Sequence, residues 1–167
     1  MSALFDHVMS QPLFCHHDHQ KSLSEFDAER ATFDYRSLLG YAVHDLVAAS
    51  AGQYDAQTIL DHVPEFWPQV AFTGYGRAVQ MATHKILDMD FDPANGDALT
   101  EALQAYLGNR SAREVYQDLT MGKAGHAYTV NDGTLWWGTP PVFTEFDYPA
   151  SFSHAFRMDA LLAIDSD

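Results

Sequence analysis

Residues 12–20 read PLFCHHDHQ, in which a proline and an apolar run lead into a cysteine, three histidines and an aspartate. A short apolar run that begins at a proline is typical of a buried strand. Side chains alternate between the two faces of a strand, so we expect His17 and His19 on one side and His16 and Asp18 on the other. At a rise of about 3.3 Å per residue, the two Cα atoms of a His-x-His pair lie roughly 6.6 Å apart, which two imidazoles on one ion can span. The stretch therefore predicts a strand that ends in a metal-binding pair.

The sequence spacing also bears on whether Cys15 joins the two histidines and whether the cluster is a metal site at all. Cys15 would share a face with His17, but it would lie about 13 Å from His19 along the strand, too far for all three to bind one ion. We therefore interpret Cys15 as a small buried apolar residue. The alternative to a metal site is an exposed polar loop, because His-x-His is a short and common pattern.

Composition limits the class of protein. The chain has 167 residues, of which 47% are hydrophobic, enough to bury the core of one ordinary domain. Nine basic against 23 acidic residues give a net charge of −14, which repels nucleic acid and anionic membranes. The N-terminal residues lack the basic segment of a secretory signal, and no apolar run approaches the ~18 residues of a membrane span. With a single cysteine, no internal disulfide can form, so we expect a soluble cytoplasmic protein.

The residues that follow the cluster predict a helical block over 30–122, flanked by strands. Apolar residues recur every four positions over 34–50, and further helices are expected over 58–63 and 75–89. Asp97 is expected to cap a helix that Gly108 ends, and a capping box is expected to open the last helix, at SARE, residues 111–114. Strands are expected at HAYTVND, residues 126–132, and at SFSHAF, residues 151–156. The fold class predicted from this order is α/β, mainly helical by content.

Two motifs resemble a known family. HDH at residues 17–19, after its apolar strand, and TGYGRA at residues 73–78 are similar to segments of the amidohydrolase superfamily, in its uronate isomerase-like and amidohydrolase 2 branch. The weaker similarity of HAFRMDALLA, residues 154–163, extends the resemblance over nearly the whole chain. It implies a (β/α)₈ TIM barrel. Residues 1–167 would form a single partial barrel domain holding about three strands, with 30–122 as a helical insertion after the first.

The resemblance also implies a site and an activity. His17 and His19 would hold a divalent metal, most often zinc, and Arg157 would bind a substrate carboxylate. Tyr35 and Arg36 would contact the substrate, a small carboxylate-bearing molecule. The implied activity is metal-dependent hydrolysis, in which metal-activated water attacks a carbonyl or acyl carbon. One alternative is aldose–ketose isomerisation of a uronate-like sugar acid, and another is a non-catalytic helical module that binds a partner.

The chain departs from the family pattern in ways that bear on activity. Cys15 stands where the family commonly has an aspartate. The ligands and the catalytic base of the later barrel strands have no counterpart, so no catalytic residue is assigned in this chain and we expect it to be inactive in isolation. Parallel strands with an open edge are poorly tolerated, which favours a second chain or a homo-oligomer.

The remaining histidines and tryptophans are expected to be structural. We expect exposed or capping roles for His44, His62 and His84, and hydrogen-bonded structural roles for His126 and His154. The tryptophans are expected to pack in the core and Asp132 to form a turn.

Overall fold

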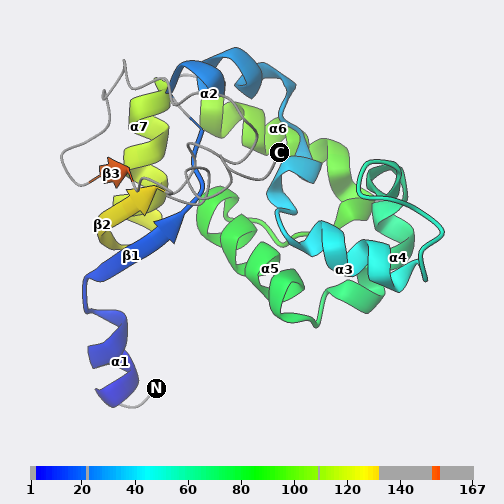
Figure 1. Cartoon of the computed structure of the whole chain (residues 1–167), viewed down its shortest axis with the longest axis horizontal. Coiled ribbons are helices and arrows are strands. Elements are labelled where there is room, and N and C mark those ends of the chain that lie inside the picture. Colours follow the sequence, from blue (N-terminus) through cyan, green and yellow to red (C-terminus); the bar gives the residue numbers. More distant parts are fainter. Residues whose placement is uncertain (1–2, 22, 109, 132–151, 155–167) are drawn as a thin grey trace, which may run out of the picture. The chain divides into compact units, whose positions relative to one another are not determined.

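The computed structural model describes residues 3–21, 23–108, 110–131 and 152–154 (Figure 1). Over these residues the chain is mainly helical and carries a small parallel sheet. It divides into two compact units, one formed by residues 1–28 and 111–167 and the other by residues 29–110. Within the described part, no helix is both long and apolar enough to cross a bilayer.

The first unit holds the sheet. Its elements are α1 (Ala3–Met9), β1 (Leu13–Asp18), α2 (Leu23–Glu29, which ends one residue into the second unit), α7 (Ala112–Gln117), the π-helical turn η5 (Asp118–Lys123), β2 (His126–Asn131) and β3 (Phe152–His154). The strand order is β1-β2-β3, and both pairings are parallel (Figure 1). The predicted strands near residues 11–17, 126–132 and 151–156 are therefore confirmed. Because the strands are parallel, their carboxyl ends lie at one edge of the sheet.

The pairing of β1 with β2 is irregular. Cys15 pairs with Thr129 and Asp18 pairs with Asn131, so β1 advances three residues while β2 advances two. An extra residue on one strand of a pair is the signature of a bulge, which disturbs the regular alternation of side chains. The faces assigned to residues of β1 from simple alternation therefore do not hold across this irregularity.

Aromatic contacts pack α2 against α7 in the first unit. The rings of Phe26 and Tyr116 lie 5.1 Å apart, and the Tyr116 hydroxyl donates to the backbone oxygen of Lys21 at 2.9 Å. Ser111 and Glu114 form the predicted capping box at the start of α7, so that prediction is confirmed. The helix this box opens falls in the unit that holds the sheet.

The second unit is helical and has its own core. Its elements are η1 (Arg30–Thr32), η2 (Tyr35–Leu38), α3 (Ala42–Ala49), η3 (Thr58–His62), α4 (Val63–Val70), α5 (Gly74–Leu87), η4 (Pro93–Asn95) and α6 (Gly96–Gly108). Helix α3 packs against α4 and α5, and α5 packs against α6. The buried cluster comprises Leu39, Ala42, Leu46, Ile59, Val63, Phe66, Trp67, Val70, Ala71, Val79, Phe91 and Leu99. The expected packing role of Trp67 is confirmed.

Three of the predicted helices differ in detail. The single helix predicted over 34–50 is wrong, because Gly40 has a φ of +48° and separates the short 3₁₀ turn η2 from α3. The segment 58–63 is mostly a 3₁₀ turn, and the helix α4 begins at Val63, where proline is tolerated in the first turn. Asp97 lies inside the first turn of α6 rather than at its cap, although the helix does end at Gly108.

Candidate metal centre

His17 and His19 come together where β1 ends. Their Nε2 atoms lie 3.0 Å apart, and the rings meet edge to face with centroids 4.6 Å apart. The prediction that these two side chains come together is confirmed. Both residues are exposed, and His19 is the first residue after the strand.

Asp18 holds the backbone between the two histidines and the residues that follow. Its Oδ1 accepts a hydrogen bond from the backbone N–H of His19 at 2.9 Å, and its Oδ2 accepts from Nε2 of Gln20 at 2.6 Å. These two bonds link Asp18, the last residue of β1, to the two residues that follow it. The carboxylate therefore orients the backbone of His19.

The donor atoms of the pair fit a divalent ion. Two nitrogens bound to one tetrahedral zinc at about 2.0–2.1 Å lie about 3.3 Å from one another, close to the observed 3.0 Å. Without an ion, the same separation suits a hydrogen bond in which one neutral imidazole donates and the other accepts. Two histidines are one ligand fewer than a catalytic zinc site requires.

A second cluster of ligand atoms includes a residue from β2. One donor atom each from Cys15, Asp18 and His126 lies within 4.8 Å of the other two, and all three residues are half-buried. Cys15 is therefore not the fully buried apolar residue that we expected, and its Sγ donates to the backbone oxygen of His17 at 3.4 Å. Nδ1 of His126 lies 3.1 Å from the Thr129 hydroxyl, as expected of a hydrogen-bonded histidine.

Sequence reasoning missed this cluster for two reasons. Strict alternation places Cys15 and Asp18 on opposite faces of β1, whereas the irregular pairing with β2 brings their ligand atoms together. His126 is far away in the sequence and reaches the cluster only through the pairing of its strand with β1. No short motif signals such a site.

Arg36 belongs to the second unit and is engaged by two carboxylates. Its Nε donates to Oδ2 of Asp34 at 2.8 Å, and its Nη1 donates to Oδ1 of Asp61 at 3.2 Å. Burial of Asp34 works to raise the pKa of its carboxyl, but hydrogen bonds from the side chain and backbone of Arg36 outweigh it, so the pKa lies below its usual value. The bond to Asp34 in turn raises the pKa of Arg36. The structure thus gives this guanidinium partners within the chain.

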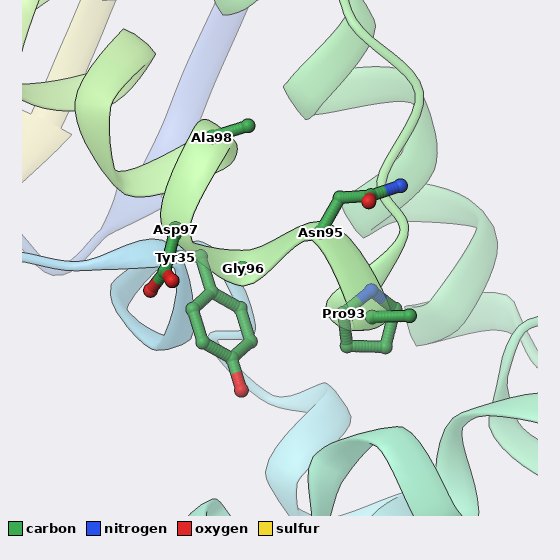
Figure 2. A pocket seen from close by; sticks show the side chains of 7 residues that line it. Tyr35, Pro93, Asn95, Gly96, Asp97 and Ala98 are labelled. Carbon is green, nitrogen blue, oxygen red and sulfur yellow. The ribbon is translucent and has the colours of Figure 1, made fainter.

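Tyr35 lines a shallow pocket of about 450 Å³ in the second unit (Figure 2). The other walls come from residues 93–98, the segment where η4 passes into α6. Figure 2 shows the Tyr35 ring beside the backbone of Gly96, where a Cβ atom would lie 2.6 Å from the ring. Burial raises the pKa of the Tyr35 hydroxyl. The ring therefore has a clear packing role against Gly96, and its predicted contact with substrate stays a prediction.

Some of the other residues singled out in the sequence lie in the described part of the structure and some do not. Arg157 lies outside the described residues, as do Asp132, Trp136 and Trp137. His44 and His84 are exposed, as expected. His62 stacks on Tyr54 with ring centroids 4.0 Å apart, which gives it a packing role. The metal pair is thus the part of the predicted site that the structure brings together.

Comparison of the chain with protein-family models, with curated proteins and with solved structures finds no match.

Proposed function

We propose that the chain forms part of a metal-dependent hydrolase of the amidohydrolase type, with His17 and His19 as metal ligands. The observation that carries the proposal is the 3.0 Å separation of their Nε2 atoms at the carboxyl end of β1. In barrels and open sheets built from parallel strands, active sites form at the carboxyl ends of the strands. Strand β2 is parallel to β1 and presents its carboxyl end at the same edge.

The residues of this chain have separate roles in the proposed site. His17 and His19 bind the ion, and Asp18 positions His19 through the backbone hydrogen bond. When bound, a divalent ion such as zinc lowers the pKa of a water molecule and polarises a substrate carbonyl group. The exposure of both histidines leaves the ion accessible to a small substrate.

The proposed enzyme needs more than the described residues supply. A third metal ligand and the catalytic base would come from further barrel strands. We place the protein in the cytoplasm, where a single reduced cysteine is the ordinary state. The isomerase alternative depends on Arg157, so the described residues add nothing in its favour.

Metal content and hydrolysis test the proposal together. We would isolate the full chain with any companion polypeptide, determine ions and subunits by native mass spectrometry, and assay zinc-loaded material on esters, lactones, amides and sugar acids. His17→Ala with His19→Ala should remove one divalent ion per chain and reduce hydrolysis to the uncatalysed rate. His16→Ala, at a neighbouring exposed histidine, is the matched control and should keep both.

Two results would contradict the hydrolase. One is a folded double variant that keeps the full complement of metal and activity. The other is native protein that binds no ion and no companion chain, which would favour a non-catalytic helical module. Turnover of sugar acids alone would favour the isomerase.

A further inference from the structure

We propose that Cys15, Asp18 and His126 form a separate binding site for a divalent transition-metal ion of the zinc or cobalt class. The site shares no ligand with the His17–His19 pair and does not depend on the proposed hydrolase. Its three donors are a thiol sulfur, a carboxylate oxygen and an imidazole nitrogen, all within 4.8 Å of one another. Sulfur and nitrogen donors in one site favour zinc and similar ions over magnesium or calcium.

The distances already approach those of a bound site. A tetrahedral zinc bound to one sulfur at about 2.3 Å and to nitrogen or oxygen at about 2.0–2.1 Å holds these ligand atoms about 3.3–3.6 Å apart. The ligand atoms lie within 4.8 Å of one another, so a closure of at most about 1.5 Å brings them to these separations, which side-chain rotation can supply. Three protein ligands leave a fourth position for water or another ligand.

The burial and hydrogen bonding of these three residues suit a metal site. All three residues are half-buried, whereas His17 and His19 are exposed. A metal-bound imidazole usually gives its second nitrogen to a hydrogen-bond partner. The Thr129 hydroxyl, 3.1 Å from Nδ1 of His126, can be that partner, in which case Nε2 binds the ion. Thr129 is itself 1% exposed, so its hydroxyl is held in place.

Binding replaces one interaction with a stronger one. The Cys15 thiol donates to the backbone oxygen of His17, and on binding it loses its proton to solvent and forms a sulfur–metal bond. Each carboxylate oxygen of Asp18 already accepts one hydrogen bond and retains a lone pair for the ion. The existing hydrogen bonds of Asp18 can therefore persist when the ion binds.

The single cysteine makes this proposal directly testable. A thiolate bound to Co²⁺ gives a charge-transfer band in the near ultraviolet that imidazole and carboxylate ligands do not produce. Because Cys15 is the only cysteine, such a band can arise from no other residue of the chain. We expect titration of the reduced full chain with Co²⁺ to produce the band and to saturate at one thiolate-bound ion per chain.

Variants then identify the other ligands. Cys15→Ser should abolish the band, and His126→Ala and Asp18→Asn should each weaken Co²⁺ binding at this site by more than about tenfold, since even a group behind a ligand typically contributes 10–100-fold. His17→Ala with His19→Ala should keep the band, and His84→Ala, at an exposed histidine of the other unit, is the matched control. Far-ultraviolet circular dichroism checks that each variant is folded, and His126→Gln, which keeps a hydrogen-bonding group beside Thr129, replaces His126→Ala where needed.

Two outcomes would overturn the proposal. Absence of the band in the reduced, folded wild type excludes the thiolate as a ligand. A band that survives His126→Ala and His126→Gln but is lost in the His17 and His19 double variant would assign the cysteine to the exposed pair. Failure of the proposed hydrolase is distinguishable, because it concerns an ion that the Cys15 band does not report.

Discussion

Asp34 shows how one side chain can serve as both a cap and an ion-pair partner. Its Oδ1 accepts from the backbone N–H of Arg36 at 2.8 Å, and with Ser37 it forms a capping box on η2. Its Oδ2 accepts from the Arg36 guanidinium. The bonds favour the charged carboxylate, so its pKa in the folded chain lies below the usual 3.8.

We predict that Asp34→Asn lowers the free energy of unfolding most at neutral pH. A carboxyl group with a lowered folded pKa stabilises the fold above its unfolded pKa, and that contribution is lost as the pH falls through the folded value. The difference between wild type and Asp34→Asn should therefore shrink below pH 3.8. Urea denaturation at neutral pH and at acid pH measures this difference in the free energy of unfolding. A difference independent of pH would show that the ionisation of Asp34 does not contribute, and Asp61→Asn, at an exposed partner of Arg36, is the control.

At the scale of elements, TGYGRA shapes the junction of α4 and α5. Thr73 caps α5 by accepting from the N–H of Gly76 at 3.0 Å, and its hydroxyl lies 2.5 Å from Oδ2 of Asp45 on α3. A Cβ atom on Gly76 would lie 2.0 Å from the backbone oxygen of Val70, whereas one on Gly74 would meet nothing within 4 Å. The second glycine of the motif thus has a packing role, because only glycine permits this close approach.

We predict that Gly76→Ala destabilises the protein by about 1–3 kcal/mol, since the clash is with backbone and forces α4 and α5 apart. Gly74→Ala, two residues away in the same helix, should be neutral or stabilising by up to about 1 kcal/mol, because alanine favours the helix. Urea denaturation of both variants provides the comparison. Equal effects at the two positions would contradict the packing argument.

At the scale of the whole molecule, the helical unit 29–110 contains the core cluster described above. A segment with its own hydrophobic core can fold as a unit. We predict that a fragment of residues 29–110 is helical and unfolds cooperatively. Leu46→Ala should cost about 2–5 kcal/mol in the full chain, because the side chain is fully buried, and should destabilise the fragment in the same direction.

The control for this prediction is Phe72→Ala. Phe72 is 83% exposed, so its loss should change the free energy of unfolding by less than about 0.5 kcal/mol. Circular dichroism during thermal unfolding measures both variants in both chains. A fragment without a cooperative transition would mean that the helical unit requires the rest of the chain.

Short sequence motifs correctly predicted several local features of this protein. The capping box at Ser111, the helix that ends at Gly108 and the His17–His19 pair each depend on residues a few positions apart, whose interactions are set by backbone geometry nearby. The break at Gly40 was missed because helix-like spacing of apolar residues continues across it. Leu39, Ala42 and Leu46, spaced by three and four residues, are buried on both sides of the turn.

The sequence by itself determined the mainly helical content, the positions of the strands and the pairing of the two exposed histidines. Only the tertiary structure decided that β1 and β2 pair in an irregular register, and with it the cluster of Cys15, Asp18 and His126. The physical reason is that strand register depends on contacts between segments far apart in the chain, and a shift of one residue moves side chains to the other face. The periodicity of side chains within one strand carries no information about the register of that strand with its neighbour.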